Sequence, residues 1–598
     1  MNPVSDSEVG RFGSLRLYAL IVFAVAVLVN LGVLGYGFVL DDLDQVLGNR
    51  FISSLKYLPD IFTSSVSATE ENAVPSNYYR PVMHFVYMLT YQFSGLKPWG
   101  FHLVNLIFSA LNSVLVLLLA TELLKARGKI SSYFALMAGL FFAVHPIHSE
   151  TASYVACVPE LFCAFFFLLS VLFYIRGRWL ASVPLYFLAL LSKETAIALI
   201  PVLFIYSLWI ERGIEGGEEG GGKKLSQAIR RLWPHIVATA VYLFLRYIAL
   251  GGFTSYSETD ISASEFLVAV VPLFIFYLQK LILPTGLNPF HAFNPYMEVL
   301  SREAQVSYLF LLVALAHLIL FIRKGRRAAL FALALLIVPL IPALYLMRVS
   351  LYIYADRYLY LPSVGFVILL SLLLRAVYGR IKSKSTEKSA GVVILSVFIV
   401  IFALYATLSV KGNRKWKDST ALISTAIALE PGNYEPRHFV GTTYLLAGEV
   451  DRAITELTTA VRLNLNGERV DRGILNRSRL SLATAYRSKG VYNEAEREIR
   501  LVLELTPGSS DAYFHLGLIS YDRGRPRDAI ASFKEALKRT RYPVDRRYIY
   551  KSLGAVEASL GLYKDALESL EAAKRLGPTD ADVARRIAVL KKMLEKNR

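Results

Sequence analysis

The sequence predicts an all-α protein with two parts, a polytopic transmembrane helical domain followed by a helical-repeat solenoid. The chain has 598 residues and is 55% hydrophobic, more than the solvated surface of a soluble protein allows. Its apolar residues gather in blocks of roughly 18–22, the length that crosses a bilayer core. After residue 411 these blocks stop, and small residues recur with a repeat period. We therefore predict a transmembrane domain over 1–410 and a repeat domain over 411–598.

The positive charge follows the membrane pattern. The net charge is +18, and in the first part the lysines and arginines form short clusters between apolar blocks, as the positive-inside rule expects. We infer that the chain does not bind nucleic acid. Cys157 and Cys163 are the only cysteines and lie in or beside an apolar block. They are expected to be packing residues, which indicates neither a disulfide framework nor a metal site.

The first apolar block, about 15–34, is too long for a signal peptide and lacks a cleavage site, so it is expected to be a retained span. Arg11 and Arg16 precede it and place the N-terminus in the cytoplasm. The following loop, 36 to about 100, is then extracytoplasmic. About eleven crossings are expected in total. The others are about 101–124, 132–144, one ending at 176, 180–191, one ending at 211, 234–250, one ending before 323, 328–346, 358–374 and 392–408.

The apolar block at 266–283 does not fit this alternation. The basic cluster at 323–327 should be cytoplasmic, and the block before that cluster should run inward. No room is left for 266–283 to cross, so we expect a re-entrant or interfacial helix there. An odd number of crossings places the repeat domain outside the cytoplasm.

The second part shows the tetratricopeptide period. Gly490 and Gly524 are 34 residues apart and are each followed by an alanine at the same spacing, Ala495 and Ala529. About four helix pairs are expected, closed by a cap helix near 583–594. Such arrays usually bind a peptide or protein in a groove, although an array can also serve only to rigidify or anchor.

Two acids stand where the first span leaves the bilayer. Asp41 and Asp42 follow the glycine-containing stretch 35–38, which would hold them near the membrane surface. A carboxylate there can act as a general base on a hydroxyl acceptor or help to bind a divalent cation. The alternative is that they are solvated loop acids.

Cations and further acids recur in the later outer loops. Arg80 can hold a phosphate through two hydrogen bonds or reach lipid headgroups. Arg357 can pair with Asp356 or bind an anionic headgroup. Glu160 lies one turn inside the fourth span, where an acid is a functional candidate, and Lys193 is its expected neutralising partner.

The segment with His145, His148 and Glu150 resembles a metal-ligand set, although hydrogen bonding to substrate or to the fold is the alternative. It lies on the predicted outer side, like the acids and cations of the other loops. The sequence therefore predicts one extracytoplasmic active site.

These motifs, taken together and in this order, resemble the transmembrane and tetratricopeptide-repeat (TMTC) family, and the resemblance covers nearly the whole chain. The set is specific jointly, although no single motif is. The motifs lie at 41–42, 79–81, 100–105, 143–150, 191–194, 281–287 and 357–366.

The resemblance implies a GT-C-like fold and an integral membrane glycosyltransferase. Its donor would be a polyprenyl-phosphate sugar, mannose by analogy, and its acceptor hydroxyls of extracytoplasmic protein, modified by inverting single displacement. Asp42 would be the base, with Asp41 next, and Arg80, Lys193 and Arg357 would bind the donor phosphate. The other substrate-site candidates are His102, His145, His148, Glu150, Glu160, Glu194 and Asp356.

Several alternatives stay open on the sequence. The acceptor could be a lipid or polysaccharide, the tail has fewer repeats than many relatives, and the chain could be a non-catalytic scaffold. No cofactor is certain, and a divalent metal ion is left open. The expected membrane is the plasma or inner membrane in a prokaryote and the endoplasmic reticulum in a eukaryote, with the site and the repeats on the extracytoplasmic side. Partners would be the lipid-linked donor, membrane lipids and an acceptor protein.

Overall fold

The chain folds into helices joined by short connections, as the sequence predicts. The computed structural model describes residues 6–66, 77–124, 129–210, 221–250, 252, 262–291, 301–323, 326–345, 354–467, 470–540, 543–577 and 580–596. These residues contain no β-strand. The chain divides into two compact units, the first ending at Thr425 and the second beginning at Ala426. The division falls after the boundary expected at 410 because Trp416 and Leu422 belong to the apolar core of the first unit.

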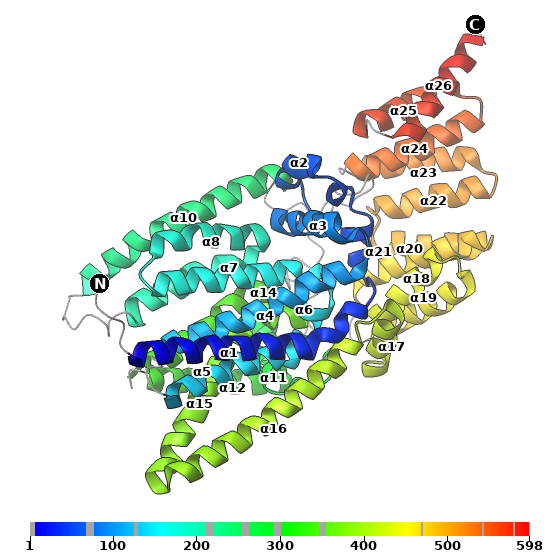
Figure 1. The fold of residues 1–598 in the computed structure, drawn as a ribbon. Helices are drawn as coiled ribbons and strands as arrows, with labels where there is room; N and C mark the ends of the chain where they lie inside the picture. The colour runs from blue at the N-terminus through cyan, green and yellow to red at the C-terminus, as the bar shows by residue number, and fades with distance from the viewer. Residues whose placement is uncertain are drawn as a thin grey trace. The chain divides into compact units, whose positions relative to one another are not determined.

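The first unit is a bundle of long helices that lie side by side (Figure 1). Helix α4 packs against α1, α5 and α7, and α8 lies between α7 and α10. On the other side of α5, α15 contacts both α13 and α16. Their bounds are α1 Asp6–Asn30, α4 Pro98–Leu123, α5 Lys129–Val144, α7 Val158–Ile175, α8 Trp179–Ser192, α10 Gly221–Leu250, α13 Arg327–Ile337, α15 Pro362–Lys384 and α16 Glu387–Arg414.

One glycine shows how tightly the bundle is packed. A Cβ atom at Gly365 of α15 would lie 2.2 Å from the carbonyl oxygen of Ala332 in α13. Any larger residue would push the two backbones apart, because buried helices have no free volume to absorb it. The close approach matters for the site, because the segment that carries Arg357 leads directly into α15.

The described residues contain eight helices long and apolar enough to cross a membrane, or nine if the bent pair 130–144 and 146–153 is one span. The expected fifth and sixth spans are shorter helices, Trp179–Ser192 and Glu194–Trp209. Among the described residues, the stretch Ala304–Val313 of helix α12 (Arg302–Arg323) is a shorter apolar helix. The chain is thus a polytopic membrane protein, and the number of eleven crossings stays a prediction.

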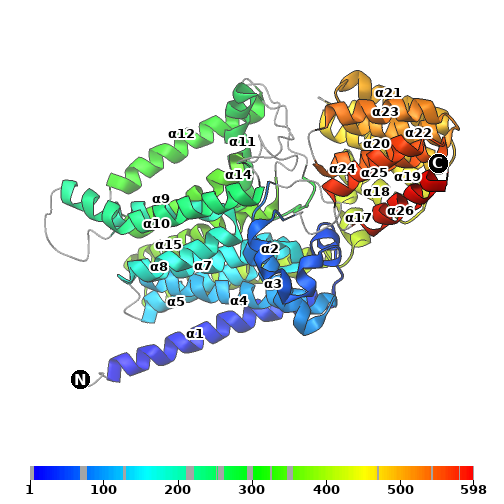
Figure 2. The ribbon, with the colours of Figure 1, turned by 90° about the horizontal axis from the view of Figure 1, so that it is seen from above.

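Helix α11 (Ala263–Ile282) covers the block expected to be re-entrant or interfacial. It is one continuous helix of 20 residues and is among the eight candidate crossings. Length and composition do not distinguish it from the other candidates, so its placement stays a prediction. It lies beside α12 at one edge of the first unit, and α1 lies at the opposite edge (Figure 2).

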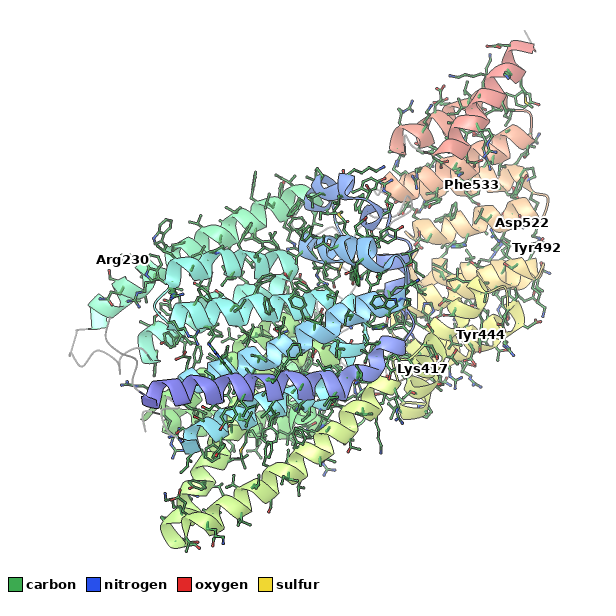
Figure 3. All side chains as sticks on the ribbon, in the orientation of Figure 1. Arg230, Lys417, Tyr444, Tyr492, Asp522 and Phe533 are labelled. Carbon is green, nitrogen blue, oxygen red and sulfur yellow. The ribbon has the colours of Figure 1, made fainter. Side chains whose placement is uncertain are left out.

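The two ends of the bundle differ in what they carry. Arg230, from the basic loop expected in the cytoplasm, and Lys417, which follows the last long helix, lie at opposite ends of the first unit (Figure 3). The end near Lys417 holds the short elements that form the site. These are η1 Leu31–Gly35, η2 Leu43–Leu47, α3 Pro81–Ser94, η5 Pro146–His148, α6 Ser149–Ser153, η6 Val155–Cys157, η7 Glu194–Ala198 and η12 Asp356–Leu359.

The second unit is a stack of helix pairs. A glycine with φ between +73° and +79° makes the turn inside each pair: Gly448, Gly490, Gly524 and Gly561. Only glycine adopts this left-handed conformation without strain, so the recurring glycines of the sequence are explained by the turns. The pairs are α18 Tyr434–Leu446 with α19 Val450–Leu465, α20 Arg472–Ser488 with α21 Tyr492–Leu505, α22 Ser510–Asp522 with α23 Pro526–Arg539, and α24 Pro543–Ser559 with α25 Tyr563–Leu576, followed by α26 Ala581–Lys596.

Candidate active site

The turn after the first span presents two neighbouring acids in opposite ways. The Asp42 side chain is fully buried. Its Oδ2 accepts a hydrogen bond from the Val39 amide at 3.1 Å, and its Oδ1 accepts one from the Ala156 amide at 2.7 Å. Asp41, by contrast, is exposed. Asp42 therefore ties the turn to the segment after α6, whereas Asp41 offers its carboxylate to the outside of the turn.

The reversal between the two acids depends on a strained residue. Leu40 has φ +47° and is the one non-glycine residue with positive φ among those that the structure describes. This conformation is unfavourable for a branched side chain, and such strain persists where the surroundings fix the backbone. Here the Asp42 amide donates to the Val39 carbonyl at 3.0 Å and the Gln45 amide to the Asp41 carbonyl at 2.7 Å.

The Asp41 backbone is held from a distant part of the chain. Its amide donates to the hydroxyl of Tyr154 at 3.1 Å. Burial raises the pKa of the Tyr154 hydroxyl well above its usual range, the charges of Asp41 and Asp42 raise it further, and Arg357 lowers it. Tyr154 therefore lies within electrostatic range of both acids and of one of the three predicted phosphate-binding cations.

Burial also raises the pKa of Asp42 well above its usual range. The two amide hydrogen bonds oppose this shift, because they favour the ionised carboxylate. Asp42 has no exposed surface through which a substrate hydroxyl could reach it. Asp41 is thus the more accessible of the two acids, and which of them is the base stays a prediction.

Each of the three predicted cations is paired with a glutamate, and Glu160 links two of them, Lys193 and Arg357. Both Arg80 nitrogens Nη2 and Nε donate to Glu194, at 2.8 and 3.3 Å. Burial alone would favour an uncharged Glu194, but Arg80 and Lys193 lower the pKa of this carboxyl to about 2. The Arg80 guanidinium also lies over the Tyr78 ring, 4.4 Å from its centroid.

Lys193 and Arg357 pair with glutamates that are more deeply buried than Glu194. Lys193 Nζ lies 2.7 Å from Glu160 Oε1, as expected from the sequence. Arg357 donates to Glu150 through its side chain at 2.5 Å and through its backbone amide at 2.9 Å. Its Nε also lies 3.5 Å from Glu160. Of the two alternatives for Arg357, a pairing with Asp356 is not found among the described ion pairs, and the Asp356 carboxylate accepts from the Tyr354 hydroxyl at 2.7 Å.

A pocket opens onto this network. It is lined by Glu160, Lys193, Arg357 and Tyr358 together with apolar side chains, and holds about 360 Å³ of empty space, including the solvent at its mouth. Arg357 has 24% of its side chain exposed and Lys193 only 6%. Of these two cations, Arg357 is therefore the one that a ligand can reach more directly.

The three candidate histidines are used by the fold. His102 Nε2 lies 3.4 Å from the Gly37 carbonyl and His145 Nε2 lies 3.1 Å from the Leu281 carbonyl. His145 Nδ1 accepts from the Ile147 amide at 3.2 Å, and His148 Nε2 lies 2.8 Å from the Ser363 hydroxyl. The described residues contain no group of three His, Cys, Asp or Glu side chains arranged to hold a metal ion. The metal-ligand interpretation of 145–150 therefore finds no support in the geometry, and we derive no step through a metal.

Sequence reasoning missed three residues that shape this site. They are Leu40, Tyr154 and Trp416. Leu40 gives no signal in the sequence, because its positive φ is imposed by the surrounding contacts. Tyr154 and Trp416 could have been noticed as large aromatics beside the predicted site, but aromatics are common at membrane interfaces.

The chain is similar in sequence to known proteins. A tetratricopeptide-repeat family model matches residues 480–544 and 521–581. A mouse protein named protein O-mannosyl-transferase TMTC3 is 24% identical over 599 residues, covering 93% of this chain and 63% of the relative. A mouse protein named protein O-mannosyl-transferase TMTC4 is 26% identical over 469 residues, covering 70% of this chain and 62% of the relative. Over most of its length the chain is similar to the TMTC proteins.

The match to TMTC relatives is long but incomplete. The chain spans 63% of the length of the mouse TMTC3 protein. Among solved structures, a tetratricopeptide-repeat protein from Parabacteroides merdae is 16% identical and covers 45% of this chain and 94% of its own, with a TM-score of 0.25. The chain itself has both a unit of candidate membrane-spanning helices and a repeat unit.

Proposed function

We propose that this protein is a glycosyltransferase that moves mannose from a polyprenyl-phosphate donor to Ser or Thr hydroxyls of an extracytoplasmic protein. The observation that carries the proposal is that Arg80, Lys193 and Arg357 each pair with a glutamate, and that Glu160 joins Lys193 and Arg357 beside one pocket. These cations come from three separate loops. Tyr154, which lies shortly before Glu160 of α7, accepts a hydrogen bond from the amide of the exposed acid Asp41. The relatives' names supply the reaction class.

Asp41 is the better candidate for the general base. A base must come within hydrogen-bonding distance of the hydroxyl that it deprotonates, and the exposed carboxylate of Asp41 can be approached from outside the turn. Asp42 is buried with both oxygens occupied by backbone amides. We assign to Asp42 the role of fixing the turn that presents Asp41.

The proposed step is a single displacement. The acceptor hydroxyl gives its proton to the Asp41 carboxylate as its oxygen bonds to the anomeric carbon. The bond between that carbon and the phosphate oxygen breaks, and the lipid phosphate leaves with the electron pair. Attack opposite the leaving group inverts the anomeric configuration. The leaving phosphate is a weak base, so positive charge placed beside it stabilises the transition state and no general acid is required.

The cations are suited to that leaving group but are not free. A donor phosphate that binds Arg80 or Arg357 replaces the glutamate that pairs with that arginine. One charge-assisted hydrogen bond to the arginine is lost and another, to the phosphate, is formed. Arg357 and Arg80, with 24% and 14% of their side chains exposed, are the accessible members. Lys193, paired with Glu160 and 6% exposed, supports them from inside.

The rest of the assignment follows from the membrane topology. The lipid tail of the donor lies in the bilayer, and the sugar meets the acceptor at the extracytoplasmic end of the first unit. The repeat unit binds the acceptor protein or a partner that delivers it, because stacked repeats present extended surfaces suited to polypeptides. We place the protein in a plasma or inner membrane, or in the endoplasmic reticulum of a eukaryote, with a GT-C-like catalytic domain.

The test compares three matched variants, Asp41→Asn, Asp42→Asn and Asp44→Asn, with the wild type in transfer from radiolabelled polyprenyl-phosphate mannose. Asp44 is an exposed acid of the same turn and serves as the control. We expect Asp41→Asn to fold normally and lose at least about 100-fold in rate, and Asp44→Asn to retain activity. Full activity of Asp41→Asn would overturn the base assignment. If the sugar is transferred only to lipid or polysaccharide, the acceptor is not a protein. If the wild type binds the donor but transfers no sugar, the result favours a non-catalytic scaffold.

A further inference from the structure

The connection between the last long helix and α17 (Ser419–Leu429) does more than link two helices. Residues 415–418 separate α16 from α17, yet Trp416 within this connection is only 4% exposed. Its ring stacks on the Tyr154 ring, with centroids 5.1 Å apart and an angle of 22° between the planes. A buried tryptophan in a short connection indicates that the connection is fixed to the bundle.

Tyr154 carries this contact directly to the proposed base. The same residue that stacks on Trp416 accepts the hydrogen bond from the Asp41 amide, at 3.1 Å. Tyr154 is 3% exposed, and Val39 and Leu422 close the apolar cluster around the pair. The position of the Asp41 peptide thus depends on a ring whose outer face is covered by Trp416.

A second contact ties the same two segments together. The Gly37 amide donates to the Lys417 carbonyl at 3.0 Å. The connection is itself held upstream, because Asn413 Nδ2 donates to Asn30 Oδ1 at 2.9 Å and the Ser409 hydroxyl to the Val144 carbonyl at 2.7 Å. The turn 37–41 is therefore bonded at both ends, by Lys417 at its start and by Tyr154 at its end.

We propose that Trp416 is a positioning residue that holds Asp41 in its catalytic place through Tyr154. The catalytic part of this inference rests on the proposed function. An aromatic stack stabilises a contact beyond the area that it buries. A shift of about 1 Å in a reacting group can lower a rate by about 100-fold. A modest packing contact can therefore have a large effect on turnover.

The experiment measures both the turn and the reaction in the full-length protein. Amide hydrogen exchange of residues 37–42 needs no activity, and we expect Trp416→Ala and Tyr154→Phe each to accelerate exchange at Asp41. In transfer from polyprenyl-phosphate mannose we expect Trp416→Ala to lower kcat by about 10–100-fold and to change the KM for the donor by less than about threefold. Trp416→Phe keeps a ring on Tyr154 and should restore most of kcat. Trp209→Ala, which removes a tryptophan that is 45% exposed, is the matched control.

A double variant separates positioning from general destabilisation. If Trp416 acts through Tyr154, Trp416→Ala adds little to Tyr154→Phe, because residues on one path are not additive. Independent, additive losses would overturn the proposal, as would unchanged exchange at Asp41 in Trp416→Ala. If hydrogen exchange at Asp41 behaves as expected but the wild type transfers no sugar, the proposed function is wrong. The structural coupling between Trp416 and Asp41 would then still hold.

Discussion

The Nζ of Lys193 lies 2.7 Å from Oε1 of Glu160, and the two side chains expose only 6% and 5% of their surface. Glu160 belongs to the first turn of α7, and Lys193 directly follows α8. Their pairing joins the ends of two adjacent helices. It also removes the need to bury either charge alone, which would be unfavourable in a membrane protein.

Removing one member of this buried ion pair should therefore destabilise the first unit more than removing one member of an exposed ion pair. We expect Lys193→Met to lower the stability by about 3–5 kcal/mol, because it leaves Glu160 buried with less compensation. Thermal denaturation in detergent measures the change. Arg176→Met, which breaks an exposed pair with Glu122 of 2.8 Å, is the control and should have an effect below about 1 kcal/mol. Equal effects of the two variants would contradict this expectation.

Freeing Arg80 should strengthen donor binding. In the structure Glu194 occupies the Arg80 guanidinium with two hydrogen bonds, and a phosphate must replace it. We expect Glu194→Gln to lower the KM for the polyprenyl-phosphate donor several-fold, whereas Arg80→Met should raise it. Glu122→Gln changes a glutamate in an ion pair elsewhere and should leave KM unchanged. An increased KM in Glu194→Gln would mean that Glu194 itself contacts the donor.

The stability of the first unit should depend on Asp356 between pH 4 and 7. Burial first, and the charge of Glu150 second, raise the pKa of this carboxyl to about 6. Because the folded pKa lies above the ordinary value of 3.8, the contribution of Asp356 is fully present below pH 3.8 and is lost as the pH rises through about 6. The melting temperature of Asp356→Asn relative to the wild type should therefore be higher at pH 7 than at pH 5. A difference that does not vary with pH would rule out this titration.

The turn glycines of the repeats should be replaceable only at a cost in stability. Gly524 has φ +73°, and a Cβ at this position would meet no atom within 4 Å. The cost of Gly524→Ala is therefore purely conformational, about 1–2 kcal/mol. Gly508 has the same open surroundings without positive φ, so Gly508→Ala should be neutral or slightly stabilising. The two variants are compared by denaturing the full chain while a spectroscopic probe in the repeats monitors unfolding.

Much of the fold could be predicted from the sequence because it depends on periodicity. Apolar blocks of crossing length indicated the membrane helices, and glycines at a repeat spacing indicated the turns of the second unit. The two shorter helices, α8 and the one that begins at Glu194, show the limit of this reasoning. An apolar block does not reveal where a helix breaks into a 3₁₀ or π-helical turn, because those breaks depend on tertiary contacts.

The membership of the site stays a prediction, and the pairing of its charges could not be predicted from the sequence. Arg80, Lys193 and Arg357 each have a glutamate partner, but the sequence neighbours Lys193 and Glu194 have different main partners. Glu194 contacts Arg80, which is 114 positions away. The opposite exposure of Asp41 and Asp42 also has no sequence signal, because it results from the backbone reversal at Leu40. Local sequence identifies charged residues, whereas long-range packing decides which of them are reachable.

The bond between the Gly37 amide and the Lys417 carbonyl has an evolutionary consequence. It joins two backbones, so substitution of either side chain can leave it intact and no residue type marks it in related sequences. Its vulnerability lies in spacing. A one-residue insertion or deletion between 414 and 419 would shift the register of the carbonyl against Gly37. We expect the length of this connection to be preserved among relatives more strictly than its composition.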